Sequence, residues 1–155
     1  MEKVSVIGGG AWGTALAQML AAAGRTTLIW ALQEEVVASI NGSHVNELYL
    51  PDVPLHTDLR ATSELAEAAA ADLTLLVTPA QFLRPVTAGL SKHLKPGVPA
   101  VICAKGIEQG SHALMSEVLS DTLAEAPQAV LSGPIFAIEV AKGLPTAVTL
   151  ACSGE

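Results

Sequence analysis

Residues 4–17 indicate the fold of the chain most clearly, because they join a strand pattern to a helix pattern through glycines: V-S-V-I-G-G-G-A-W-G-T-A-L-A. The first four residues are mostly β-branched and favour a strand, whereas the small residues from Thr14 onward favour a helix. Gly8, Gly10 and Gly13 have the spacing G-x-G-x-x-G within this strand, turn and helix. That combination predicts a dinucleotide-binding loop that takes NAD or NADP.

Each glycine of the loop has a separate expected role. Gly8 permits a tight turn out of the strand, Gly10 lets a pyrophosphate approach the backbone, and Gly13 lets the helix pack close to the sheet. Free N–H groups at the start of the Thr14 helix would face the phosphates and make an anion cradle. The alternative is a glycine-rich turn that only joins a strand to a helix, and the small residues that follow disfavour it.

Strand-like and helix-like segments alternate along the chain, which predicts a Rossmann-type doubly wound, mainly parallel α/β sheet with helices on both faces. The expected strands are residues 4–7, 26–30, 73–78, 100–104, 129–131 and 147–152. The expected helices are residues 14–23, 34–41, 63–71, 82–94, 111–125 and 136–142. Ser63 and Ser111 are expected to cap two helices, and Gly24 to end the first. The unpatterned segment 41–59 is expected to border a site.

Length and composition indicate a single self-folding domain and limit its possible partners. Its 155 residues suffice for one domain, residues 1–155, without a disulfide or a metal. A net charge of −7 with eight Lys and Arg disfavours nucleic acid and anionic membranes as partners. Cys103 and Cys152 lie in apolar runs and are expected to be small core residues. The N-terminus has no targeting pattern, so a cytoplasmic protein is expected.

Metal and nucleophile chemistry have little support in this sequence. The four histidines lack metal-ligand spacing, and each is interpreted as a surface or loop residue: His44, His56, His93 and His112. No G-x-S-x-G or Walker pattern occurs. We therefore expect no bound metal and no catalytic nucleophile.

Coenzyme choice stays open at this stage. An acidic residue about 20 positions after the glycine loop holds the adenosine ribose of NAD, and a basic residue there accepts the phosphate of NADP. The chain has W-A-L-Q at residues 30–33, which contains neither. Glu34 and Glu35 follow, but they are equally suited to the first turn of a solvated helix.

Three further motifs follow the ends of expected strands, where ligands bind in open parallel sheets. In C-A-K-G-I-E, Lys105 would point toward the nicotinamide and hold a substrate oxygen or phosphate; a surface lysine is the alternative. In T-P-A-Q-F, Phe82 would cover the nicotinamide, although core packing is the stronger alternative for this side chain. In S-G-P-I-F-A, residues 132–137, a turn leads into a short helix at the same edge.

Taken together, the motifs resemble the N-terminal domain of the NAD(P)-dependent glycerol-3-phosphate dehydrogenases. The resemblance rests on the glycine loop, N-E-L-Y-L-P-D-V at residues 46–53, T-P-A-Q-F, A-K-G-I-E, and S-G-P-I-F-A-I-E-V-A-K-G-L-P-T-A. These motifs together span nearly the whole chain. The resemblance implies a cytoplasmic enzyme that interconverts sn-glycerol 3-phosphate and dihydroxyacetone phosphate for phospholipid synthesis. A homodimer of the full-length enzyme is left open.

The resemblance also implies roles for individual residues. Cofactor-binding residues would be Gly8, Gly10, Ala11, Trp12, Gly13, Leu32, Phe82, Lys105 and Ala137. Substrate-binding residues would be Lys105, Gly133 and Ile135. The catalytic lysine, a proton acceptor, would come from a helical C-terminal domain beyond Glu155, so this chain alone is expected to bind dinucleotide without turnover.

Two positions depart from the family pattern. Leu32 stands where bacterial members often have a basic residue, which weakens an NADPH preference. Ile135 replaces a usual Ser or Thr and removes a hydroxyl that would bind substrate. The alternatives are the cofactor domain of another NAD(P)-dependent dehydrogenase and a non-catalytic dinucleotide-sensing module.

Overall fold

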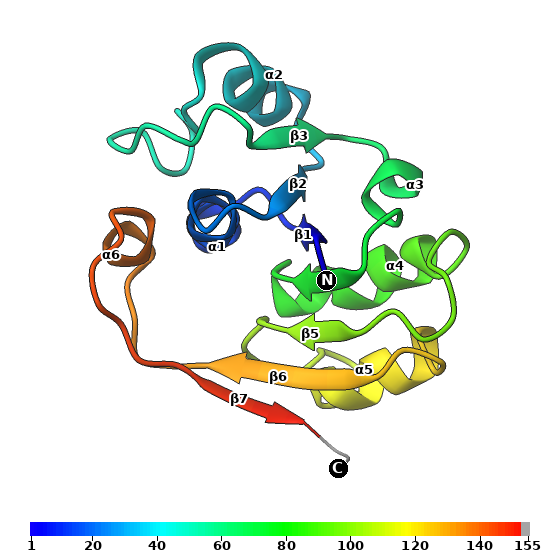
Figure 1. Cartoon of the computed structure of the whole chain (residues 1–155). Helices are drawn as coiled ribbons and strands as arrows, with labels where there is room; N and C mark the ends of the chain where they lie inside the picture. Colours follow the sequence, from blue (N-terminus) through cyan, green and yellow to red (C-terminus); the bar gives the residue numbers. More distant parts are fainter. Residues whose placement is uncertain (153–155) are drawn as a thin grey trace.

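The computed structural model describes residues 1–152, which form one seven-stranded sheet flanked by helices (Figure 1). The strands are β1 Lys3–Ile7, β2 Thr26–Trp30, β3 Arg60–Thr62, β4 Leu73–Leu76, β5 Ala100–Ile102, β6 Gln128–Ser132 and β7 Thr149–Cys152. The helices are α1 Ala11–Ala22, α2 Glu34–Ser43, α3 Leu65–Ala68, α4 Ala80–Leu90, α5 Met115–Thr122 and α6 Ala137–Ala141.

The strand order is β3-β2-β1-β4-β5-β6-β7. All neighbouring strands are parallel except β6 and β7, which pair antiparallel. The chain therefore builds outward from β1 to β3, returns to β4 on the other side of β1, and continues outward. This order is that of a doubly wound dinucleotide-binding fold, and it confirms the predicted fold class. It leaves a crevice at the carboxyl ends of β1 and β4.

Two hydrophobic cores lie on opposite faces of the sheet. The first collects buried side chains of α1, α2, α6 and the segment that follows α2, and the second collects those of α3, α4 and α5. Figure 1 shows these two helix groups on either side of the strands. Val6 faces the first core and the next residue, Ile7, faces the second, because successive strand side chains point to opposite faces. Each fully buried Val or Ile contributes about 2 kcal/mol.

One strand, β3, was not expected from the sequence. It has only three residues, which is too short for an alternating pattern. Its backbone is held by β2 on one side and by a side chain on the other: Asn41 Nδ2 donates to Ala61 O, and Ala61 N donates to Asn41 Oδ1, both at 2.9 Å. The carboxamide of Asn41 thus replaces a neighbouring strand at this edge.

The ends of several elements differ from the sequence-based expectation. The expected helix from Thr14 begins at Ala11, because Gly10 takes the N-cap position. Ser63 and Ser111 cap no helix; α3 begins after Glu64 and α5 after Leu114. The backbone N–H of Leu114 donates to Glu117 Oε2 at 2.7 Å instead.

The expected end of the first helix is confirmed. Gly24 has φ +77° just after α1, a conformation in which glycine is favoured, and its N–H donates to Ala21 O. Strands β4 and β5 end at Leu76 and Ile102, two residues earlier than expected, and the freed residues line the site described below.

The two cysteines have different environments. Cys103 is buried, as expected, whereas Cys152 is exposed, so its assignment to the core was wrong. The reason is that β7 forms the edge of the sheet and all four of its residues are exposed. Within residues 1–152, no helix combines the length and hydropathy that a membrane crossing needs.

Candidate functional site

The glycine loop turns sharply at the carboxyl end of β1. Gly8 has φ +134°, and a Cβ there would lie 2.9 Å from the carbonyl carbon of Val77. At Gly13 a Cβ would lie 1.9 Å from Gly8 O. Both positions therefore require glycine, and the expected roles of these two residues in the turn and in close helix packing are confirmed.

Gly10 differs from its neighbours because the space beside it is empty. A Cβ at this residue would meet no atom within 4 Å. The first helical hydrogen bond runs from Thr14 N to Gly10 O at 2.9 Å, so the N–H groups of residues 11–13 have no partner inside α1. No acidic side chain lies in this first turn. The open space and the helix amides together form a cradle suited to an anion.

A groove of about 670 Å³ runs across this cradle. One wall and the floor come from the glycine loop and the ends of β2 and β4, and the other wall comes from α4. Its lining residues are Gly8, Gly9, Gly10, Ala11, Trp12, Gly13, Trp30, Leu32, Gln33, Tyr49, Leu65, Val77, Thr78, Pro79, Phe82, Pro85 and Val86. The volume lies within the range of small-molecule and cofactor sites.

The segment after α2 supports the glycine loop from behind. Asn46 is fully buried, and its Nδ2 donates to Gly9 O at 2.9 Å and to Thr14 Oγ1 at 2.7 Å. Its Oδ1 accepts from Tyr49 N at 3.2 Å. The expectation that this segment borders a site is confirmed, because Tyr49 lines the groove and its hydroxyl accepts from Gln33 Nε2.

A second hollow of about 330 Å³ adjoins the groove on the side of β5 and β6. It is lined by Trp12, Val77, Thr78, Pro79, Cys103, Ala104, Lys105, Leu131, Ser132, Gly133, Ile135 and Ala137. The Lys105 ammonium is exposed and lies 3.4 Å from Gly133 O. Burial raises the pKa of the Cys103 thiol to about 12, so this group is a neutral wall of the hollow near pH 7.

Four residues line both spaces and form the boundary between them: Trp12, Val77, Thr78 and Pro79. Thr78 is 5% exposed, and its Oγ1 is buried without a hydrogen-bond partner in the described structure. The last three residues follow β4 directly. The groove and the hollow are therefore two ends of one continuous site at the carboxyl edge of the sheet.

The structure brings the residues proposed from the sequence to these two spaces, but not all to the same one. Gly8, Gly10, Ala11, Trp12, Gly13, Leu32 and Phe82 line the groove. The hollow is lined by the other four: Lys105, Gly133, Ile135 and Ala137. Of these, Lys105 and Ala137 were expected to bind the cofactor, but they do not line the groove and are separated from it by the shared boundary. Phe82 is 58% exposed, and the core-packing alternative for it was wrong. Leu32, two residues after the end of β2, is 74% exposed where it lines the groove.

Sequence reasoning placed T-P-A-Q-F at the carboxyl edge of the sheet but gave Thr78 and Pro79 no role of their own there. Val77 was assigned to the strand without a role in the site. The position of all three directly after a central parallel strand was the available signal. Asn46 was also missed, because nothing local in its sequence indicates that its carboxamide reaches residues more than 30 positions away.

Comparisons with known proteins agree with this geometry. A sequence model described as the N-terminus of NAD-dependent glycerol-3-phosphate dehydrogenase matches residues 3–155. The glycerol-3-phosphate dehydrogenase, NAD(P)+, of Parvibaculum lavamentivorans is 55% identical over 154 residues, and that of Paramagnetospirillum magneticum is 58% identical over 153 residues. The crystal structure of glycerol-3-phosphate dehydrogenase from Coxiella burnetii aligns with a TM-score of 0.92 at 33% identity.

The alignments cover this chain and its relatives to different extents. Each of the three covers 99% of this chain. They cover 46% of the Parvibaculum protein, 56% of the Paramagnetospirillum protein and 47% of the Coxiella chain. The chain thus spans about half the length of the relatives it matches.

Proposed function

The chain belongs to the NAD-dependent glycerol-3-phosphate dehydrogenase family, where it matches the N-terminal part, and on this basis we propose that it binds NAD or NADP for the interconversion of sn-glycerol 3-phosphate and dihydroxyacetone phosphate. Residues 1–155 act as the dinucleotide-binding domain. A helical substrate domain, in a longer chain like that of the relatives, completes the enzyme. The observation that carries the proposal is the continuity between the groove at the glycine loop and the hollow at Lys105.

The groove fits a dinucleotide. Its middle is the cradle at Gly10, where open space and free helix amides suit a pyrophosphate. Leu32, Gln33 and Tyr49 lie at the end of β2, where the adenosine half binds in this fold. None of these three side chains is charged, so neither the ribose hydroxyl of NAD nor the phosphate of NADP has an ionic partner among them.

The hollow fits the substrate. Lys105 places an ammonium at its mouth, which suits a phosphate or a developing alkoxide. Gly133 offers a backbone carbonyl beside that ammonium. Ile135 supplies an apolar wall where a hydroxyl would be usual, so substrate contacts in this region fall to Lys105 and the backbone.

The bound nicotinamide supplies hydride acceptance from the alcohol carbon, or hydride donation in the reverse direction. This chain's residues orient the reactants: Trp12 and Thr78 line both spaces, so they lie where the nicotinamide and the substrate would meet. Lys105 holds the substrate oxygen or phosphate. The proton of the hydroxyl passes to a lysine of the C-terminal domain, so the present chain binds dinucleotide without turnover.

Titration calorimetry with NADH and NADPH tests the cofactor site on this chain. Gly10→Val places a side chain in the open cradle and is expected to weaken binding by at least about tenfold, because it occupies the pyrophosphate position. Gly42→Val is the matched control, since a Cβ at Gly42 also meets no atom within 4 Å but lies in α2, away from the groove. Absence of binding by the unaltered chain to either coenzyme contradicts the proposal.

Two other functions remain distinguishable by experiment. A different dehydrogenase activity would appear in a panel of phosphate and hydroxyacid substrates given to the full-length enzyme. A non-catalytic dinucleotide sensor would not need Lys105, so coenzyme binding that is unchanged in Lys105→Ala, together with no oxidation of glycerol 3-phosphate by the full-length protein, would favour the sensor. The two substrate-side motifs, A-K-G and S-G-P-I-F-A, support the dehydrogenase.

The cellular setting is part of the same proposal. The enzyme acts in the cytoplasm, feeds phospholipid synthesis, and has neither nucleic acid nor a membrane as a partner. A homodimer is the proposed assembly of the full-length enzyme. Cell fractionation and light scattering of the full-length protein test location and assembly respectively.

A further inference from the structure

The loop between β5 and α5 carries Lys105 and is tied to the first turns of α4. Gln81 Nε2 donates to Ile107 O at 2.9 Å, and Gln109 N donates to Gln81 Oε1 at 2.8 Å. One carboxamide thus pairs with the backbone of two loop residues, one of them two positions beyond Lys105. Gly106 has φ +126°, and a Cβ there would lie 3.2 Å from the Cβ of Ala80. The loop therefore lies directly against the start of α4.

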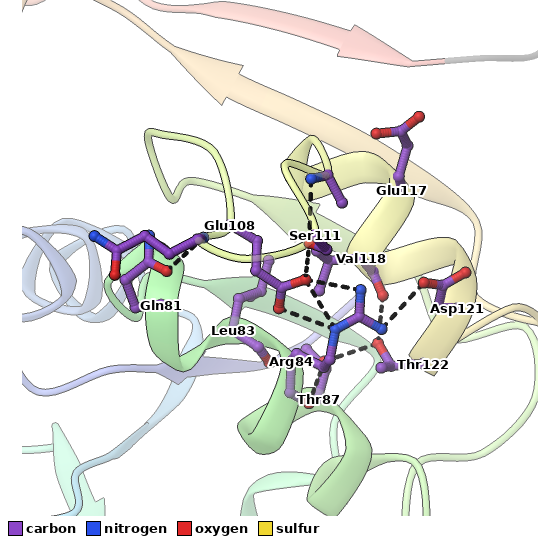
Figure 2. A network of polar contacts seen from close by, with 12 residues as sticks. Gln81, Leu83, Arg84, Thr87, Glu108, Ser111, Glu117, Val118, Asp121 and Thr122 are labelled. Carbon is purple, nitrogen blue, oxygen red and sulfur yellow. Dashed lines mark hydrogen bonds and ion pairs between the residues drawn. The ribbon is translucent and has the colours of Figure 1, made fainter.

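A second tie joins the same loop to α4 through charge (Figure 2). Arg84 Nε donates to Glu108 Oε1 at 2.9 Å, and Arg84 Nη2 donates to Glu108 Oε2 at 3.0 Å, a two-pronged geometry that fixes both groups. Ser111 Oγ also donates to Glu108 Oε2. The Glu108 side chain is only 12% exposed. Its hydrogen bonds from Arg84 and Ser111 hold the pKa of the Glu108 carboxyl below its usual value.

Another face of helix α4 lines the groove. Phe82, Pro85 and Val86 line the groove that we assign to the dinucleotide. Gln81 and Arg84 are three residues apart, a spacing that places them on one helix face. The helix therefore contacts the cofactor groove with one face and the Lys105 loop with another.

We propose that Gln81, Arg84 and Glu108 are positioning residues that set the place of Lys105 relative to the bound dinucleotide, with α4 as the shared frame. The inference rests on the proposed function of Lys105 as a substrate-binding residue. Within residues 1–152 the one hydrogen bond of the Lys105 ammonium is the 3.4 Å bond that it donates to Gly133 O, so its position depends on the backbone of its loop. A displacement of the loop by about 1 Å would misplace the ammonium and cost up to about a hundredfold in rate.

The test uses the full-length enzyme with NADH and dihydroxyacetone phosphate. Glu108→Gln removes the charge of the carboxylate with almost no change in side-chain size, and Arg84→Met removes the guanidinium but keeps an unbranched apolar stem. We expect each to raise KM for dihydroxyacetone phosphate or lower kcat, so that kcat/KM falls by about tenfold, while Kd for NADH stays within about twofold. That split is the signature of a misplaced substrate group beside an intact cofactor site.

Asp121→Asn is the matched control. Asp121 also accepts from Arg84, at 3.0 Å from Nη1, but its side chain is 62% exposed and makes no hydrogen bond or ion pair with the Lys105 loop in the described part of the chain. We expect its kcat/KM to stay within about twofold of the unaltered enzyme. Equal losses in Asp121→Asn and Glu108→Gln would overturn the inference.

Lys105→Ala distinguishes a failure of the positioning role from a failure of the proposed substrate-binding role of Lys105. If Lys105→Ala impairs the reaction but Glu108→Gln and Arg84→Met do not, the positioning role fails and the proposed function stands. If Lys105→Ala has no effect, the proposed substrate-binding role of Lys105 fails, and the inference fails with it. A parallel loss of NADH affinity and of thermal stability in Glu108→Gln and Arg84→Met would show a merely structural tie and overturn the inference.

Discussion

Strands β1 and β7 show how unevenly the chain covers its own sheet. In β1, between β2 and β4, four of five residues are buried, whereas all four residues of β7 are exposed at the sheet edge. Helices cover both faces of the sheet around β1 and β4. The β6–β7 end instead exposes large apolar side chains: Val130, Phe136, Ile138, Leu144, Val148 and Leu150.

This difference divides the candidate site. The groove lies at the covered end, where Asn46 donates to the backbone of the glycine loop and Gly8 lies against Val77. The hollow shares part of that wall but takes its other wall from Gly133, Ile135 and Ala137, which are only half-buried. The candidate site therefore has a well-covered groove and a less buried hollow.

The largest expected contrast separates two leucines, one from each end. Leu76 in β4 is fully buried, and Leu76→Ala is expected to cost about 3 kcal/mol because it leaves a cavity. Leu150 in β7 is 59% exposed, and Leu150→Ala is expected to cost less than about 0.5 kcal/mol. Urea unfolding of this chain measures both. Similar losses would show that the two ends are equally well packed.

The next contrast concerns two glycines that a methyl group would crowd. A Cβ at Gly13 would lie 1.9 Å from Gly8 O in the covered end, and one at Gly133 would lie 2.8 Å from Ala147 O in an exposed segment. Gly13→Ala is expected to cost about 2 to 3 kcal/mol and Gly133→Ala about 1 kcal/mol, because the exposed backbone can shift. Denaturant midpoints give both values, and the reverse order would contradict the comparison.

Asn46→Ala tests the support of the glycine loop. The change leaves Gly9 O and Thr14 Oγ1 without their buried donor and is expected to cost about 1 to 2 kcal/mol. Because the loop would shift, NADH affinity is expected to fall as well, by about fivefold. Calorimetry against NADH measures this second effect. Unchanged affinity at reduced stability would mean that the cradle keeps its shape without Asn46.

The smallest expected effect depends on pH. Asp72 accepts hydrogen bonds from Lys3 N and Glu2 N at 3.1 and 2.8 Å, and these lower the pKa of its carboxyl. The stabilisation is thus fully present above the unfolded-state pKa of about 3.9 and is lost as pH falls through the lower folded-state value. Asp72→Asn should therefore differ from the unaltered chain at pH 6, and the difference should shrink as pH falls below the unfolded-state pKa and through the folded-state pKa of Asp72. A constant difference in unfolding free energy would contradict this role.

Much of the fold followed from local patterns. The β-branched runs predicted β2 with its observed bounds and placed β1 and β6 to within one residue at each end. The glycine spacing predicted the loop that crosses the groove, because a missing Cβ has a purely local effect on the backbone. Strand β3 escaped this reasoning because it is short and is held by Asn41. A strand was expected over residues 147–152, and β7 lies within that range, but it is too exposed to follow the burial rule that placed Cys152 in the core.

The amino-acid sequence is sufficient to predict the alternation of strands and helices, the glycine turn and the family, since these depend on short stretches of the chain. The strand order, the antiparallel β7, and the meeting of Trp12 with Thr78 and Pro79 at the boundary of the two spaces are visible only in the folded chain. The same holds for the pairing of Arg84 with Glu108, 24 residues away. The physical reason is that side-chain packing and parallel strand pairing join residues across long chain separations, which no local pattern encodes.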